Sequence, residues 1–496
     1  MKVKRLHLQN YGRFEDLKID FAPTAEKTSN VTVIVGNNGA GKSQILQALA
    51  TGLSWFVEKI SFDEEGQQIK TTAIKNGSDK SSLKIVIKDS KKSFEDNSLI
   101  SWNVSTIKEN RLAPAVYTSN QDGVDDLVEY YRNKSKNNIS ISLPIVVYYP
   151  VKRYVGGKNY GFMKELLFEQ LSGYDHALKS SINFDDFFHW FRYREDIENE
   201  QSRRMEESAI KEIKESNRLV QLSLTLLNKN NEDLDSSMNP ENTKELKKGL
   251  DKLFELIELG ESEIKRGIKI TDKPLHNVRK SVESFTSFRN LRIYRQGRPT
   301  MIVEKDGEEL DVNQLSQGEK SLLALVGDIA RRLALLNPSL DNPLEGEGVV
   351  MIDEVDLHLH PKWQHDLIDK LVKTFPNVQF ILTTHSPHVI SDRNDILLYS
   401  LDDGELTEMP NVYGEDVNTV LTKIFDVDIR DSEVEKQFTI IRRAISNHEY
   451  SVAESNIERL AEKLPSDHLE LLKCRLLLAQ AKLKDSNTEE PRHAED

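Results

Sequence analysis

An octapeptide, Gly36 to Ser43, limits the possible folds of this chain more than any other stretch of it. It reads GNNGAGKS and matches the phosphate-binding pattern G-x-x-x-x-G-K-[ST] at every fixed position. A β-branched run, residues 31–35, precedes it, and a segment of helical composition, residues 44–49, follows it. Strand, loop and helix come in the order that nucleotide binding requires, which predicts an α/β fold. The alternative is a glycine-rich turn without function, and the combined context disfavours it.

The chemistry of this loop depends on its residue types. Glycines at positions 36, 39 and 41 let the backbone turn tightly and point successive N–H groups at a polyphosphate. Lys42 would reach the β and γ phosphates of ATP and take part in catalysis, and the Ser43 hydroxyl would bind Mg²⁺. The predicted nucleotide contacts are Gly36, Asn37, Asn38, Gly39, Ala40, Gly41, Lys42 and Ser43.

The composition restricts the class of protein further. A length of 496 residues predicts about three domains. No apolar run approaches the ~18 residues of a membrane span, and the amino terminus has no signal-peptide design, so we expect a cytoplasmic protein without a membrane segment. Cys474 is the only cysteine, which excludes a disulfide within the chain. The net charge of −14 disfavours general adhesion to nucleic acid, although it leaves room for a local basic groove.

One segment is dense enough in basic side chains to form such a groove. A solvated face is the more common meaning of a charged run, and a DNA-binding groove stays open as the alternative. The basic residues of this segment are Arg279, Lys280, Arg289, Arg292, Arg295 and Arg298.

The middle of the chain is predicted to be a helical hairpin. Leucines at 246, 250 and 253 and an isoleucine at 257 share one helix face, and the polar run 228–242 is typical of a turn. Arms of roughly 30 to 50 residues would extend about 45 to 75 Å. The aromatic cluster within residues 184–193 either packs at the root of the hairpin, which we favour, or stacks on nucleic-acid bases.

Three further motifs follow in order along the chain. Leu315 to Glu319 reads LSQGE, and Ser316 at a helix start can offer its hydroxyl and nearby N–H groups to a phosphate. The apolar run 349–352 ends in Asp353 and Glu354, which predicts a magnesium ligand and a base for the attacking water.

A second strand, 378–384, ends at His385, which is placed to contact the γ-phosphate and to take part in catalysis. His358, His360 and His365 lie nearby, but no clear fourth ligand accompanies them, and loop or helix-start roles are favoured over a metal site.

This ordered set resembles ABC-class, AAA-like ATPases of the SMC, RecF and OLD kind. The resemblance implies an ABC-type P-loop nucleotide-binding domain, split by the inserted hairpin and followed by a C-terminal helical region. It implies that Ser316 and Gly318 complete the ATP site of a second subunit, in a head-to-tail homodimer or higher oligomer. Asp356 takes the place of the D-loop residue, and Arg13 lies in a turn that adjoins the nucleotide. No unambiguous glutamine loop is present.

The resemblance also divides the chain and implies partners. The expected segments are 1–165 and 291–412 for the two ATPase lobes, 166–290 for the hairpin and 413–496 for a partner-docking helical region. The phrases YYPVKR, IDEVDLHLHPKWQ and TTHSPHVI resemble PtuA, the ATPase family of Septu antiviral defence. That likeness implies an HNH nuclease partner similar to PtuB, with DNA bound through the complex. The alternative function is a DNA-repair or chromosome-structuring ATPase that binds DNA directly.

Overall fold

A computed structural model describes two compact units, Met1–Tyr413 and Gly414–Asp496. The described residues are all except 93–98, 109–118, 138–140, 152, 155–168, 179–181, 184, 234–239, 266, 268, 392, 426–431, 466–467 and 489–496.

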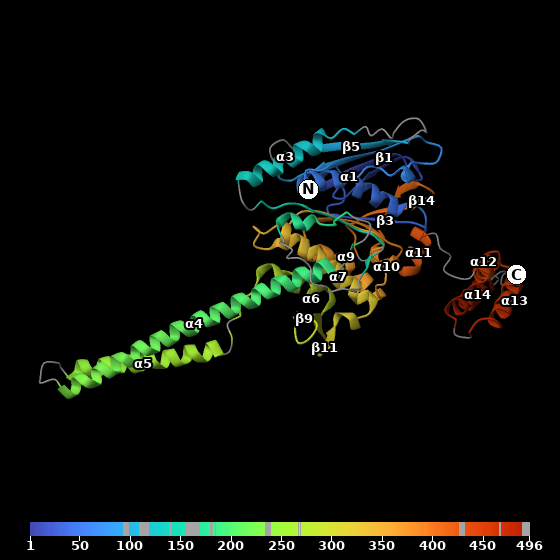
Figure 1. The fold of residues 1–496 in the computed structure, drawn as a ribbon. Helices are drawn as coiled ribbons and strands as arrows, with labels where there is room; N and C mark the ends of the chain where they lie inside the picture. Colours follow the sequence, from blue (N-terminus) through green and yellow to red (C-terminus); the bar gives the residue numbers. More distant parts are fainter. Residues whose placement is uncertain are drawn as a thin grey trace, which may run out of the picture. The chain divides into compact units, whose positions relative to one another are not determined.

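The first unit is built around a six-stranded sheet (Figure 1). Its strand order is β15-β14-β3-β13-β12-β6, and every adjacent pair is parallel except β14 with β15. Every residue of β3, β13, β12 and the edge strand β6 is buried, because helices or other sheets cover both faces of a parallel sheet. The bounds are β3 Val31–Val35, β6 Ile145–Tyr149, β12 Gly348–Ile352, β13 Val378–Thr383, β14 Leu397–Asp402 and β15 Glu405–Glu408.

An antiparallel sheet of order β2-β1-β4-β5 forms a second layer. Helix α1 (Lys42–Phe62) contacts both this sheet and the central one. The contact with β4 is close, because a Cβ at Gly52 would lie 2.2 Å from Cδ1 of Ile85. The bounds are β1 Lys2–Tyr11, β2 Phe14–Asp20, β4 Lys80–Lys88, β5 Ile100–Ile107, η1 Thr71–Ala73 and α3 Asp122–Asn137.

The side chains of helix α7 (Gln317–Leu336) are buried almost throughout. A small sheet of order β11-β10-β9 precedes α7 in the chain. Helix α6 packs along α7. The bounds are β7 Arg153–Tyr154, η2 Gln170–Tyr174, β8 Ile182–Asn183, α6 Lys273–Thr286, β9 Arg289–Tyr294, β10 Thr300–Lys305, β11 Glu308–Asp311, η3 Val312–Gln314, η4 Pro343–Glu345, α8 Pro361–His365, α9 Leu367–Thr374 and α10 Pro387–Ile390.

The inserted hairpin has arms of unequal length, which the sequence pattern did not indicate. Helix α4 (Asp185–Asp233) has 49 residues and α5 (Pro240–Lys265) has 26, and the two lie side by side (Figure 1). Helix α4 continues through residues 228–233, which were assigned to the turn, because Asn and Asp cost only about 0.7 kcal/mol each in a helix. At the root, Phe187 and Trp190 are buried, and Gly327 of α7 leaves space for the Phe187 ring. These buried aromatic side chains pack at the root as favoured, whereas Tyr193 of the same cluster is 41% exposed and Phe184 lies outside the described residues.

The second unit is a helical cluster (Figure 1). Its core includes Phe438 of α12, Ile457 of α13 and Leu471 of α14, and Cys474 is buried among them as a small apolar residue. The bounds are α11 Val417–Phe425, α12 Ser432–Ser446, α13 Tyr450–Ala461 and α14 Leu469–Thr488. No helix of the described part combines the length and apolar character needed to cross a bilayer.

Candidate nucleotide site

The phosphate loop joins β3 to α1 and has the backbone geometry that its glycines allow. Gly36, Gly39 and Gly41 have φ angles of 147°, 79° and 111°, which side-chain-bearing residues rarely adopt. There is also no room for a side chain at Gly36, since a Cβ there would lie 2.1 Å from the carbonyl oxygen of Leu401. Substitution at Gly36 would therefore displace either the loop or β14.

The Lys42 side chain is hydrogen-bonded to the backbone at the start of its own loop. Its Nζ donates hydrogen bonds to the carbonyl oxygens of Gly36, at 2.8 Å, and of Asn37, at 3.0 Å. Burial lowers the pKa of Lys42, while the charges of Asp353, Glu354 and Asp356 act to raise it. A buried ammonium facing carboxylates in this way is suited to exchange its carbonyl partners for phosphate oxygens.

Arg13 lies against the same loop. A guanidinium nitrogen donates to the carbonyl oxygen of Gly39 at 2.6 Å, and the Arg13 N–H donates to Oε1 of Gln44 at 3.3 Å. The turn between β1 and β2 is thus attached to the middle of the loop and to the first turn of α1, and a cationic side chain stands beside the expected phosphate position.

The acidic end of β12 is held by the neighbouring strand β13. The Thr383 hydroxyl donates to Oδ1 of Asp353 at 2.6 Å and accepts the Glu354 N–H at 2.8 Å. Thr384 donates to Oδ1 of Asp356 at 2.5 Å. The sequence analysis assigned no role to either threonine. Two consecutive hydroxyl residues at the end of a strand could have indicated hydrogen-bond partners for the acidic pair at the end of β12.

The backbone of Glu354 and the pKa of His385 mark these two residues as catalytic candidates. Glu354 has φ 46°, a left-handed conformation that is strained for a residue with a Cβ. Burial and the nearby charge of Lys42 lower the pKa of His385 below its ordinary value, whereas Asp356, Glu354 and Asp353 act in the opposite direction. The imidazole is therefore neutral at pH 7 and can accept as well as donate a hydrogen bond.

The LSQGE segment begins α7 with a capping box. Ser316 donates from its hydroxyl to Oε2 of Glu319 at 2.8 Å, and its N–H donates to the same oxygen at 2.9 Å. Lys305 holds the other carboxylate oxygen at 2.7 Å. In the part of the chain that the structure describes, no hydrogen bond or ion pair joins Ser316 or Gly318 to the phosphate loop of the same chain.

Gly318 instead adjoins the segment that follows Asp356. A Cβ at Gly318 would lie 2.2 Å from the carbonyl oxygen of His358, so glycine is required for this approach. His360 caps α8 by accepting the Lys362 N–H at 3.3 Å, which is the helix-start role expected for it.

The residues present fit a magnesium ion. Ser43 and Asp353 line one cavity of about 700 Å³ at the carboxyl ends of β6 and β12. A hydroxyl and a carboxylate are hard oxygen ligands of the kind that Mg²⁺ prefers. When bound with ATP, the ion would neutralise phosphate charge at this position. Gln47 and Tyr148 line the same cavity, and sequence reasoning assigned no function to either.

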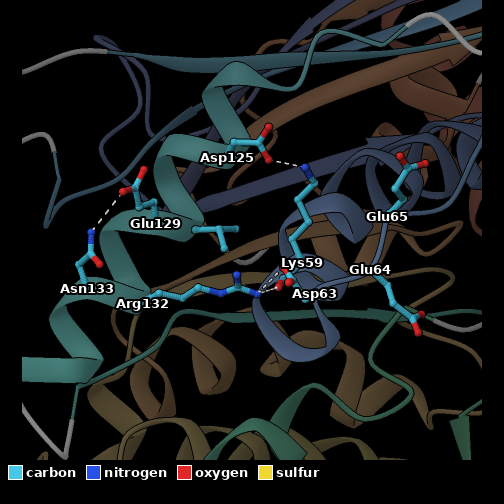
Figure 2. Close-up of a pocket in the computed structure, with 9 residues that line it drawn as sticks. Lys59, Asp63, Glu64, Glu65, Asp125, Glu129, Arg132 and Asn133 are labelled. Carbon is cyan, nitrogen blue, oxygen red and sulfur yellow. Dashed lines mark hydrogen bonds and ion pairs between the residues drawn. The ribbon is translucent and has the colours of Figure 1, made fainter.

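A second cavity, of about 420 Å³, lies between the end of α1 and α3 (Figure 2). Charged side chains pair across it: Lys59 with Asp125, and Arg132 with Asp63 at 3.0 Å. These ion pairs tie α3 to α1, which is a structural role.

Two arginines of the basic segment are paired with carboxylates at the root of α4. Arg279 contacts Glu195 and Glu198 at 2.8 Å each, and Arg295 contacts Glu195 at 2.5 Å and Asp196 at 2.6 Å. Because Glu195 and Glu198 are themselves buried, these arginines compensate interior charge at the root of α4.

Fold and site together define a P-loop ATPase of ABC type. Residues 1–390 match a family model described as an AAA ATPase domain. The chain therefore belongs to this AAA ATPase family and is a relative of retron ATPases. It is 32% identical over 457 residues to the retron Ec83 probable ATPase of Escherichia coli, covering 87% of this chain and 78% of the relative. The retron Vc95 probable ATPase of Vibrio cholerae is 33% identical over 401 residues, covering 79% and 71%.

The resemblance to PtuA is confirmed only in part. The Septu protein PtuA of Bacillus thuringiensis is 29% identical over 173 residues, which is 33% of this chain and 42% of that protein. The SMC head domain of Thermotoga maritima covers 83% of this chain and 99% of its own, with 14% identity and a TM-score of 0.37. An Smc head domain of Pyrococcus furiosus, bound to the C-terminal domain of ScpA, covers 82% and 96%, with 17% identity and a TM-score of 0.42. The fold assignment rests on the sheet topology and the family match.

Proposed function

We propose that two copies of this chain enclose ATP and Mg²⁺ head to tail, and that the nucleotide state controls a partner nuclease in an antiviral defence complex. The observation that carries the proposal is the separation of two half-sites. Lys42 and the carboxylates at the end of β12 gather at the phosphate loop, whereas Ser316 bonds to Glu319 of its own helix and Gly318 lies against the segment after Asp356. A second copy is the natural source of the missing half.

The proposed roles follow the chemistry of each group. Lys42 and the loop N–H groups bind the phosphates, with Arg13 beside them. Ser43 and Asp353 hold the cation. Glu354 accepts a proton from the attacking water, and neutral His385 contacts that water or the γ-phosphate. Asp356, positioned by Thr384, would communicate with the second copy.

The partner proposal rests on relatives and on the C-terminal unit. Relatives named as retron ATPases and as Septu protein PtuA support a place in defence against phage. An HNH nuclease similar to PtuB, acting on DNA in the cytoplasm, is the partner we propose. Helix α14 carries leucines on both its buried and its exposed sides, including Leu471 inside and Leu476, which is 59% exposed. An apolar exposed face on a small helical unit is suited to docking another protein.

Glu354→Gln tests the ATPase part. The variant should still bind ATP and should accumulate as a dimer. Its hydrolysis rate should fall at least 100-fold, because a general base contributes roughly 10²- to 10⁴-fold to the rate. Light scattering and phosphate release measure the two effects. Glu26→Gln, at an exposed loop position, is the matched control and should behave like the unmodified protein. Unchanged turnover and assembly in Glu354→Gln would refute the role of Glu354.

A further inference from the structure

A groove of about 480 Å³ runs between the two helices of the hairpin. Helix α4 and helix α5 contribute four lining residues each, which are Ala209, Glu212, Ile213, Ser216, Leu253, Leu256, Ile257 and Gly260. The two helices approach each other closely at the bottom of this hairpin groove, since a Cβ at Gly260 would lie 3.2 Å from Cδ1 of Ile213. Small side chains beside that contact leave the groove hollow, and apolar side chains form most of its walls.

The apolar surface beside the groove is wider than the contact between α4 and α5 requires. Ile257 is buried against α4, but Leu253 and Leu256 are 46% and 59% exposed. On α4, Leu219 lies seven residues after Glu212, so it shares the same helix face, and it is exposed as well. A helix with so broad an apolar arc is typically covered on more than one side. Another helix is therefore needed to cover this face.

Charged side chains of opposite sign follow the two edges of the groove. On the α4 edge, Glu212 and Glu215 are exposed and lie three residues apart. On the α5 edge, Lys248 and Lys252 are exposed, and Lys252 lies four residues before Leu256 on the same side of the helix. Among the described residues, no ion pair joins any of these four charges to another side chain of the chain. One edge is thus acidic and the other basic.

We propose that the hairpin groove is an interface between two copies of this chain, in which the hairpins stack face to face and each α4 lies over the α5 of the other copy. A two-fold axis along the groove exchanges the two edges, so the acidic edge of one copy meets the basic edge of the other. Leu256 of each copy then enters the groove of the other as a knob enters a hole. Symmetry supplies the reversed order of charges, which an unrelated partner would need to match separately.

This contact goes beyond the proposed function, because it requires no nucleotide. Engineered cysteines test it in the full chain, in a Cys474→Ala background that removes the only native thiol. Leu253→Cys places a thiol in the groove. Glu255→Cys is the matched control, because residue 255 is exposed and lies two positions further along α5, on the opposite side of the helix.

Both variants are treated with a short bismaleimide in EDTA without nucleotide, and the products are separated on a denaturing gel. Leu253→Cys should be converted mainly to a cross-linked dimer, whereas Glu255→Cys should remain mainly monomeric. Equal yields from the two positions would overturn the inference.

Leu256→Asp tests the same interface by affinity. The exposed position permits the change without loss of folding, which circular dichroism checks. The dissociation constant of the nucleotide-free dimer, measured by sedimentation, should rise roughly 30-fold or more, as for loss of a central interface side chain. Glu215→Lys should weaken the dimer as well, and Lys252→Glu in the same chain should restore it. An unmodified protein that is monomeric without nucleotide, even if it binds a different protein through this face, would overturn the inference.

Failure of this interface is distinguishable from failure of the proposed function. If Glu354→Gln dimerises with ATP while Leu253→Cys gives no cross-link, the inference alone is wrong. If Leu253→Cys is cross-linked while Glu354→Gln neither dimerises with ATP nor loses turnover, the nucleotide-dependent contact alone is wrong.

Discussion

The hydroxyl of Tyr149, at the end of β6, donates a hydrogen bond to Oδ2 of Asp328, 2.9 Å away in the middle of α7. The same carboxylate accepts hydrogen bonds from the fully buried side chains of Arg331 and Arg332, at 2.7 Å each. Asp353, one residue beyond β12, donates its backbone N–H to the carbonyl of Tyr149 at 2.9 Å. The acidic end of β12 and helix α7 are therefore joined through Tyr149.

Asp328→Asn should strongly destabilise the first unit. The two arginines hold the pKa of Asp328 far below its usual range despite complete burial, so the carboxylate is charged at neutral pH. Removing its charge leaves two buried guanidinium groups uncompensated, with an expected loss of about 3–5 kcal/mol. Urea unfolding at pH 7 measures the loss.

Tyr149→Phe is the control for that prediction. It removes one neutral donor to Asp328 and keeps the ion pairs, so the cost should be only about 1 kcal/mol. Equal losses for Tyr149→Phe and Asp328→Asn would show that the ion pairs add nothing to stability.

Mixing two inactive variants should restore ATPase activity. Lys42→Met removes the phosphate-binding ammonium, with a loss of about 1.5–3 kcal/mol of nucleotide affinity, or roughly 10- to 150-fold. Ser316→Arg blocks the half-site offered to a second copy. A mixed dimer keeps one composite site with both groups intact, so phosphate release should reappear on mixing.

The matched control is a mixture of either variant with Lys84→Met, which changes an exposed lysine of β4 and retains both half-sites. That mixture should hydrolyse ATP at any mixing ratio, because the Lys84→Met chain contributes both intact half-sites. A mixture of the two inactive variants that remains inactive would contradict the head-to-tail arrangement.

Stability should depend on pH through His385. Its pKa in the folded chain lies below the ordinary value of about 6.5, so between these two values the unfolded chain binds more protons than the folded chain. The contribution of His385 is present above about pH 6.5 and is lost as the pH falls through the folded pKa. His385→Gln should therefore weaken the decline in unfolding free energy below about pH 6.5, relative to the unmodified protein.

Urea unfolding at a series of pH values measures this difference. His276→Gln, at an exposed position of α6, is the control and should leave the pH dependence unchanged. Identical curves for His385→Gln and the unmodified protein would rule out a lowered pKa for His385.

Charge reversal at Arg295 should affect stability rather than DNA binding. Its guanidinium contacts buried Glu195 and exposed Asp196, and a glutamate there would add repulsion to an interior carboxylate. We expect a loss of about 1–3 kcal/mol, between values for surface and buried pairs. Arg289→Glu, which is 73% exposed, should cost less than about 0.5 kcal/mol.

A DNA-binding assay on the purified protein completes this comparison. Salt-dependent binding that is lost in a folded Arg295→Glu variant would restore the basic groove as a DNA site. Binding that is absent, or unchanged by the substitution, agrees with a structural role for Arg295.

Much of the candidate site could be predicted from the chain itself, because each motif is short and its chemistry demands particular residue types. A loop such as GNNGAGKS needs glycines for its φ angles and a lysine for phosphate, and both requirements are local. The acidic pair at Asp353 and Glu354 is equally local, since charge directly after a buried strand requires a function or a partner. The helical hairpin followed from side-chain periodicity for the same reason.

Contacts between distant segments depended on the tertiary structure. Strand order brings Thr383 to Asp353, and packing of α7 on the sheet brings Tyr149 to Asp328, which is 179 residues away in sequence. Folding likewise sets Arg295 against Glu195, so the charge of this arginine, which belongs to a basic run in sequence, is compensated in space. The residue type determines which interactions a side chain can make, whereas strand register and packing determine which other side chain it contacts.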